Sequence, residues 1–61
     1  MSSKIRRVRE GEDINEPGWR IGRVLLTEEV PIGTGTAMER VFTVELVPAG
    51  LWTPEKVSFA A

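Results

Sequence analysis

The feature that most constrains this 61-residue chain is the stretch from Trp19 to Pro48. It holds two runs of β type that flank the segment Gly33 to Thr36. Glycines at alternate positions permit a positive φ, and threonines tolerate solvent, so this segment is typical of the turn in a β-hairpin. Because little chain remains outside this stretch, a hairpin here makes the protein all-β.

The second run, from Arg40 to Val47, alternates with a period of two. Phe42, Val44 and Leu46 share one face, and β-branched residues are frequent, which suits a pleated strand. The alternative is a helix over Thr36 to Leu46, packed on a small sheet in an α+β fold. Val44 and Leu46 fit a helical stripe poorly, and β-branched side chains disfavour a helix, so we predict a strand.

The first run, from Trp19 to Thr27, changes phase at Gly22. Trp19 and Ile21 share one face, whereas Val24 and Leu26 are displaced by one residue. A glycine within a strand often marks a β-bulge, which would return both pairs to the same side of a sharply bent strand.

The strand is expected to continue as an exposed arm over Glu28 to Ile32. Pro31 lacks an N–H group and therefore belongs on a sheet edge or beyond the paired region.

The N-terminal part of the chain predicts a short strand and a loop. Met1 to Ser3 is expected to be frayed, and Lys4 to Arg9 is expected to form a strand of irregular phase. Glu10 to Gly18 is rich in turn formers and should be a loop. Ile14 is its only large apolar residue, so we expect it to anchor the loop on the core.

The C-terminal part predicts a break, one tight turn and a last strand. Pro48 to Gly50 ends the hairpin, and Leu51 and Trp52 are expected to be buried. Thr53 to Lys56 suits one 3₁₀ turn, because threonine can cap it and proline favours its first position. Val57 to Phe59 alternates as a short strand.

Two segments, Gly18 to Val24 and Leu51 to Val57, give the chain a pattern that resembles an SH3-like small β-barrel. The predicted fold is therefore a small SH3-like barrel or a strongly bent antiparallel sheet of four or five strands. It forms one domain over residues 1–61, with a long central hairpin and the 3₁₀ turn before the last strand. The resemblance implies a nucleic-acid binder, a peptide binder or an accessory subunit, and fold alone does not choose among these. The proline-peptide groove of signalling SH3 domains needs a row of exposed aromatic residues, which this chain lacks.

Composition argues against an enzyme. The chain has no histidine, cysteine or tyrosine, so histidine-based triads are absent and a zinc site is excluded. Glu28 and Glu29 would point to opposite faces of a strand, and Gly33 to Gly35 lacks the lysine and helix of a phosphate-binding loop. We expect no catalytic residue, metal, cofactor or small-molecule substrate.

The sequence indicates a cytoplasmic protein without a membrane segment. No charged start is followed by an apolar signal region, and the longest apolar run, Val24 to Leu26, is far too short to span a bilayer. Hydrophobic residues make up 41% of the chain, so its core should be thin. A partner or a second copy of the chain would supply the missing burial.

Two functions fit these observations. The first is a non-enzymatic protein-interaction module, such as an accessory subunit, inhibitor or assembly factor. It would dock through the central hairpin and a patch of tryptophan and arginine, because exposed apolar residues and tryptophan are common at interfaces. The residues predicted to bind the partner are Trp19, Arg20, Arg23, Ile32, Met38 and Trp52.

The second function is nucleic-acid binding through a local basic face. The net charge is −1, so binding over the whole surface is disfavoured, but basic residues cluster near the N-terminus. The acidic run from Glu10 to Glu16 follows at once, and self-compensation between the two blocks is the simpler interpretation. The residues of the basic face would be Lys4, Arg6, Arg7, Arg9, Arg20 and Arg23.

Overall fold

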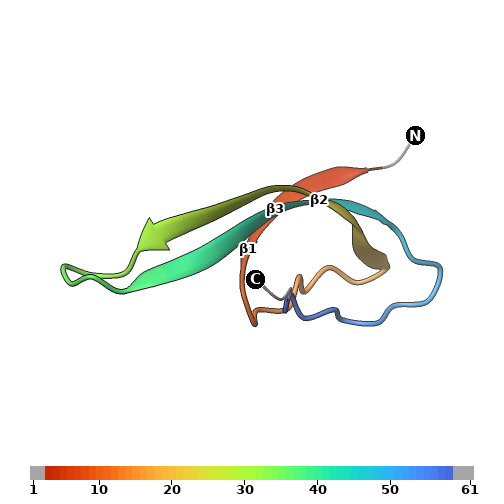
Figure 1. The fold of residues 1–61 in the computed structure, drawn as a ribbon. Helices are drawn as coiled ribbons and strands as arrows, with labels where there is room; N and C mark the ends of the chain where they lie inside the picture. Colours follow the sequence, from red (N-terminus) through yellow and green to blue (C-terminus); the bar gives the residue numbers. More distant parts are fainter. Residues whose placement is uncertain (1–2, 59–61) are drawn as a thin grey trace.

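The computed structural model describes residues 3–58 and is all-β (Figure 1). It contains the strands β1 (Lys4–Arg9), β2 (Trp19–Pro31) and β3 (Met38–Pro48). They form one open antiparallel sheet in the order β1-β3-β2. The described residues therefore hold three strands, not the four or five that the sequence predicted, and they contain no helix.

The central strand confirms the hairpin and overturns the helical alternative. Met38–Pro48 is a strand throughout, so a helix over Thr36 to Leu46 is wrong. β3 pairs with β1 along one side and with β2 along the other, which satisfies its backbone on both edges. This double pairing suits the β-branched residues of its sequence.

One face of the sheet carries the core. Phe42, Val44 and Leu46 are buried, as their alternation predicted. Val8 lies directly opposite Phe42 on β1, and Val24 lies opposite Val44 on β2, so these side chains share the same face. We call it the core face and the opposite one the outer face.

β2 bends through two bulges. The register shifts between Ile21 and Arg23, which confirms the bulge predicted at Gly22. A second shift, between Val24 and Leu26, was not predicted. It brings Leu26 opposite Thr43, on the outer face, where Leu26 is 53% exposed. The prediction that Leu26 lies on the same face as Val24 is therefore wrong. The first bulge places Val24 on the core face, and the second bulge moves Leu26 to the outer face.

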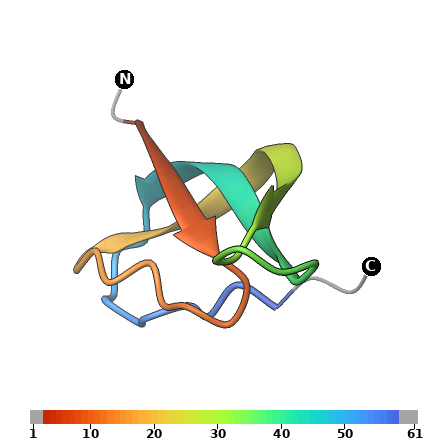
Figure 2. The same cartoon turned by 90° about the vertical axis from the view of Figure 1, so that its left-hand side faces the viewer.

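Two irregular segments cover the core face, as Figure 2 shows. Ile14, from the loop between β1 and β2, and Val57, from the C-terminal segment, are fully buried and pack on the strands. The two segments are also hydrogen-bonded to each other. The Ile14 N–H donates to the Glu55 carbonyl at 3.1 Å, and the Val57 N–H donates to the Glu12 carbonyl at 3.2 Å. Ile14 is thus the anchor that the sequence predicted.

The C-terminal segment differs from its prediction in three ways. The expected 3₁₀ turn over Thr53 to Lys56 is absent: this stretch is irregular, and Lys56 forms an isolated β-bridge with Asp13. No strand is present at residues 57 and 58; Phe59, like Met1 and Ser2, lies outside the described residues. Leu51 and Trp52, expected to be buried, are 82% and 52% exposed, since the chain turns away from the sheet at Gly50, where φ is +81°.

The hairpin extends beyond the rest of the molecule (Figure 1). β1 ends at Arg9, and the last backbone hydrogen bond on this side runs from the Glu10 N–H to the Arg40 carbonyl at 3.0 Å. From there on β2 and β3 form a two-stranded ribbon, residues 29–40, which we call the arm; the remainder is the body. The extents of 41 × 19 × 19 Å reflect this elongated shape. The turn falls where the sequence predicted it, with Gly33 at a φ of +64°.

Candidate functional site

The tip of the arm exposes two large apolar side chains. Ile32 is 48% exposed and Met38 is 52% exposed, on either side of the turn. The Ile32 N–H donates to the Ala37 carbonyl at 2.9 Å, which closes the hairpin and holds both chain segments together. β1 and the loop after it reach the base of the arm, where Arg9 pairs with Glu39 and Glu10 pairs with Arg40, whereas Ile32 and Met38 lie beyond these contacts, at the turn. These two residues of the predicted partner site are therefore available to another molecule.

The two tryptophans have different surroundings. Trp19 is half-buried and packs against the core, and the Lys4 Nζ lies 4.9 Å from the centre of its ring. Trp52 is 52% exposed, beside the exposed Leu51. The loop between β3 and Leu51 lies at the end of the molecule opposite to the hairpin turn (Figure 1). The predicted partner residues thus do not form one patch: Ile32 and Met38 are at one end and Trp52 is towards the other.

The predicted basic residues are paired with glutamates. Glu16 accepts hydrogen bonds from Lys4 at 2.8 Å and from Arg6 at 3.1 Å. Three further arginines pair across the strands, with distances of 3.1, 3.6 and 3.1 Å, in the pairs Arg7–Glu28, Arg9–Glu39 and Arg23–Glu45. The compensation of charge predicted from the sequence is therefore present, although most of the acidic partners come from the hairpin and not from the run after β1.

These cations are also divided between the two faces of the sheet. Lys4 and Arg6 lie opposite core-face residues of β3, whereas Arg7, Arg9 and Arg23 lie on the outer face. Arg20, the remaining member of the predicted set, donates to the carbonyl of Ile21 at 3.3 Å. The six residues do not converge on a common basic surface.

Glu16 is the group whose electrostatic environment is most distinct. The hydrogen bond from Lys4 is the largest cause that holds the pKa of the Glu16 carboxyl below its ordinary value of 4.5; desolvation opposes it, and the charges of Lys4 and Arg6 add smaller effects in the lowering direction. This carboxylate ties the loop before β2 to the side of β1. It thereby joins two segments that are distant in the sequence.

Several backbone groups at the sheet edges are capped by the chain itself. The Trp19 N–H donates to the Glu16 carbonyl at 3.1 Å, and the Ile21 N–H donates to the carboxylate of Glu55 at 2.9 Å. On β1, the Arg9 N–H donates to the Glu12 carboxylate at 3.2 Å. The sequence did not indicate these caps, because Glu55 lies 34 positions from Ile21 and no local pattern connects them.

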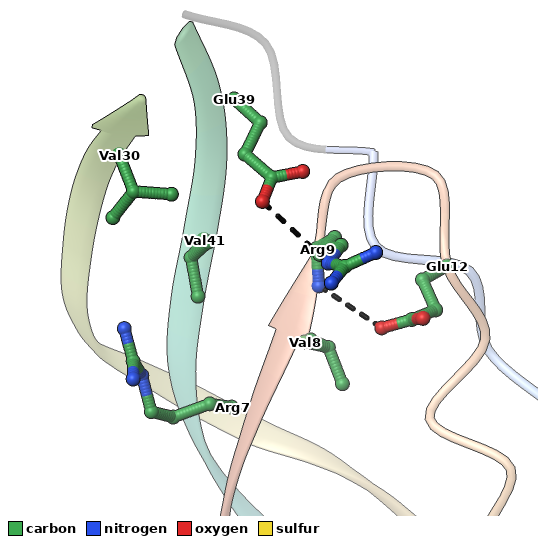
Figure 3. Close-up of a pocket in the computed structure, with 7 residues that line it drawn as sticks. All are labelled: Arg7, Val8, Arg9, Glu12, Val30, Glu39 and Val41. Atoms are coloured by element: carbon green, nitrogen blue, oxygen red, sulfur yellow. Dashed lines mark hydrogen bonds and ion pairs between the residues drawn. The ribbon is translucent and has the colours of Figure 1, made fainter. Parts of the chain in front are cut away.

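A depression of about 490 Å³ lies on the outer side, where the arm meets the body. Figure 3 shows Val30 and Val41 beside it and the ion pair of Arg9 with Glu39 across it. Sequence reasoning missed this feature because three segments build it: β1 with the loop after it, the end of β2 and the start of β3. Its lining residues are Arg7, Val8, Arg9, Glu12, Val30, Glu39 and Val41.

The described part of the chain shows no arrangement for metal binding or membrane insertion. Residues 3–58 contain no group of three or more acidic side chains placed to hold a metal ion. The same residues include no helix with the length and apolar character needed to cross a bilayer.

Comparison with known proteins gives no match. No family model, no curated protein and no solved structure is significantly similar to this chain.

Proposed function

We propose that this chain is a small, non-enzymatic protein-interaction module that docks onto a partner through the tip of its arm. The observation that carries the proposal is the exposure of Ile32 and Met38 on a two-stranded extension. An isolated hairpin is only marginally stable in water, so an arm of this kind gains order when another surface covers it. A partner that buries both side chains would provide that cover.

The composition of the molecule supports a binding role over a catalytic one. The sequence has no histidine or cysteine, and the acidic side chains other than Asp13 lie in ion pairs with arginine and lysine or at backbone caps. A general acid or base needs a free group within reach of a bound substrate. The resemblance to SH3-like barrels is compatible with this role, because such folds include accessory subunits, but the proposal does not depend on it.

Trp52 and its neighbour Leu51 form a second candidate contact, at the other end of the molecule. Tryptophan is frequent at the centre of interfaces, and this one is 52% exposed. Since the ends lie far apart along the 41 Å axis, a single compact partner would use either the tip or the Trp52 side. The tip has the stronger support, because none of the residues in the core cluster comes from the arm.

Nucleic-acid binding through Lys4, Arg6, Arg7, Arg9, Arg20 and Arg23 is the weaker proposal. Phosphate contacts require arginine and lysine that are free to leave their present partners, and all of this set except Arg20 lie beside a glutamate. A titration of DNA and RNA binding against salt tests it. A steep loss of affinity with salt, flattened by Arg6→Ala with Arg7→Ala, would favour this proposal over the first.

The test of the first proposal compares three forms of the immobilised protein. The wild type, a tip variant (Ile32→Ser with Met38→Ser) and a control variant (Leu51→Ser) are used to capture partners from a lysate of the source cells. Leu51 is 82% exposed at the other end, so its substitution matches the loss of apolar surface without touching the tip. Circular dichroism and size-exclusion chromatography with light scattering establish that all three are folded and report their oligomeric state.

We expect one or more proteins that bind the wild type and the control variant and that are lost, by about tenfold or more, from the tip variant. Two hot-spot side chains of this size account for such a loss. Equal capture by all three forms, or a strictly monomeric protein that captures nothing, would contradict the proposal.

A further inference from the structure

We infer that the free edge of β2, over Thr27 to Pro31, is a strand-addition site for an extended, basic segment of a partner protein. This inference rests on the proposed function, since it specifies how the arm would hold its partner. Strand addition joins an extended peptide to a sheet edge through main-chain hydrogen bonds, and side chains beside the edge select the sequence.

The direction of each backbone group on β2 follows from the hairpin closure. Neighbouring residues of an antiparallel strand bond alternately to one side and to the other. The Ile32 N–H donates to the Ala37 carbonyl, so Ile32 faces β3. Every second residue before it, Val30 and then Glu28, therefore also has its backbone groups directed towards β3. The N–H and C=O groups of Thr27 and Glu29 then face outward. Pro31 faces outward as well, where its missing N–H costs no bond with β3.

The outward groups of the arm differ from those of the body. In the body, Trp19 and Ile21 on this same edge have their N–H groups capped by Glu16 and Glu55. Within residues 3–58 no hydrogen bond reaches the outward backbone groups of Thr27 and Glu29. The chain therefore caps the edge of β2 at Trp19 and Ile21 and leaves it open at Thr27 and Glu29, from the end of the body into the arm, where no other segment stands in the way of a peptide (Figure 1).

The side chains along this open edge define the chemistry of the added strand. Glu28, which pairs with Arg7, lies on the outer face, and Glu29, 3.8 Å from Arg40, lies on the other face. Their side chains remain 41% and 61% exposed, so each carboxylate can also accept a second cation from an added strand. A strand placed beside β2 would set one residue next to each of them, and cations at these places form favourable cross-strand pairs. Leu26, 53% exposed on the outer face, favours an apolar residue opposite it. The expected partner segment therefore carries two successive cations, with an apolar residue two positions from the cation that faces Glu28.

The same charges disfavour a second copy of this chain in the two registers centred on the glutamates. In a two-fold antiparallel pair, one residue lies opposite its own equivalent. A pair centred on position 28 would face Glu28 with Glu28, and one centred on 29 would face Glu29 with Glu29. Like charges directly opposite each other destabilise a sheet. Charged residues on an edge protect it from self-pairing, and here they still admit a strand of opposite charge.

The test uses a short blocked peptide that repeats Lys-Lys-Thr-Val, which in an antiparallel pairing sets its lysines beside Glu29 and Glu28 and its valine beside Leu26. A peptide of equal length that repeats Glu-Glu-Thr-Val serves for comparison. Binding to the full ¹⁵N-labelled chain is followed by NMR at low salt. We expect the basic peptide to shift the amides of Thr27 and Glu29 and to slow their hydrogen exchange, whereas the acidic peptide leaves both unchanged. Glu29→Lys should weaken binding about fivefold, because one attraction becomes a repulsion, and Asp13→Lys, an equal change of charge in the loop after β1, should not.

A second variant tests the backbone and not the charge. Thr27→Pro removes one outward N–H and leaves the bonds between β2 and β3 in place, as Pro31 does in the natural sequence. This substitution should weaken the affinity for the basic peptide by about two- to tenfold, which is the effect of losing one hydrogen bond. The Glu29→Lys comparison keeps the test decisive if Thr27→Pro fails to fold.

Four results would overturn the inference: no binding of the basic peptide, equal binding of the acidic peptide at this edge, shifts centred on Ile5 and Arg7 of the β1 edge, or self-association that protects Thr27 and Glu29 without peptide. These results are distinct from failure of the proposed function. Capture of a partner that depends on Ile32 and Met38, without peptide binding, would leave the proposed function standing and remove only this inference.

Discussion

The body and the arm of this protein use the same two strands under different conditions. In the body, Ile14 and Val57 cover the core face, and side chains such as Glu55 close the sheet edge. In the arm, the ribbon has no covering segment, and Ile32 and Met38 face solvent. The comparison shows that hairpin sequence alone does not separate a structural strand from a binding strand. What separates them is the chain that packs beside each, and the predictions below test this difference.

The largest expected contrast is between two isoleucines. Ile14, in the loop of the body, is fully buried, whereas Ile32, at the tip of the arm, is 48% exposed. Ile14→Ala should cost about 2–5 kcal/mol of unfolding free energy, which approaches the whole stability of a chain this small. Ile32→Ala should change it by less than about 0.5 kcal/mol. Urea unfolding measures both, and similar losses would mean that the arm is part of the core.

A second contrast concerns two glycines. At Gly22 an added Cβ would lie 2.9 Å from the Val47 Cγ1 and 3.3 Å from the Glu45 carbonyl, because the bulge brings β2 close to β3. Gly22→Ala should therefore destabilise the protein by about 1–3 kcal/mol. Gly35 in the turn of the arm has nothing within 4 Å of such an atom, so Gly35→Ala should stay within about 0.5 kcal/mol. Thermal unfolding of both variants checks this prediction. If Gly22→Ala left the stability unchanged, β2 and β3 would not be crowded at Gly22.

The third prediction removes an edge cap from the body. Glu55→Ala would leave the half-buried Ile21 N–H without its acceptor, at a cost of about 1–3 kcal/mol. Glu55→Gln keeps an oxygen acceptor at the same place and should restore most of the loss. Hydrogen exchange at the Ile21 amide should become fast in the alanine variant only. If the amide exchanges rapidly in the wild type, the cap is not formed in solution.

The pattern of the central strands made much of the body predictable. The alternation of Phe42, Val44 and Leu46 located the core face, the phase change located the bulge at Gly22, and the isolated Ile14 located the loop anchor. These features depend on local periodicity, which a sequence displays directly. β1 was predicted with its observed bounds, Lys4–Arg9, although its apolar residues follow no regular phase.

The features that sequence reasoning missed depend on distant segments. The second bulge, before Leu26, leaves no glycine as a signal, and the irregular path of Thr53 to Lys56 follows from bonds to the loop that begins near Gly11. Local propensity favoured a 3₁₀ turn there, and tertiary pairing prevailed. Of the candidate site, the exposed tip could be predicted. The ion pairs of the arginines, the backbone caps and the open edge of β2 could not, because they depend on which residues lie opposite each other in the sheet.

The smallest expected effect concerns Glu16, which joins β1 to the loop before β2. Its pKa is lowered in the folded state, so its contribution to stability is present above about pH 4.5 and is lost as the pH falls through the lowered value. Glu16→Gln should therefore reduce the acid sensitivity of the urea midpoint below that pH and leave its high-pH dependence unchanged. In a Lys4→Met background, which removes the first cause of the shift, Glu16→Gln should have a smaller effect, as a double-mutant cycle measures. The arm does not contain this contact, so an acid transition confined to the amides of the arm, with those of Arg6 and Trp19 unaffected, would contradict the assignment of the ion pairs to the body.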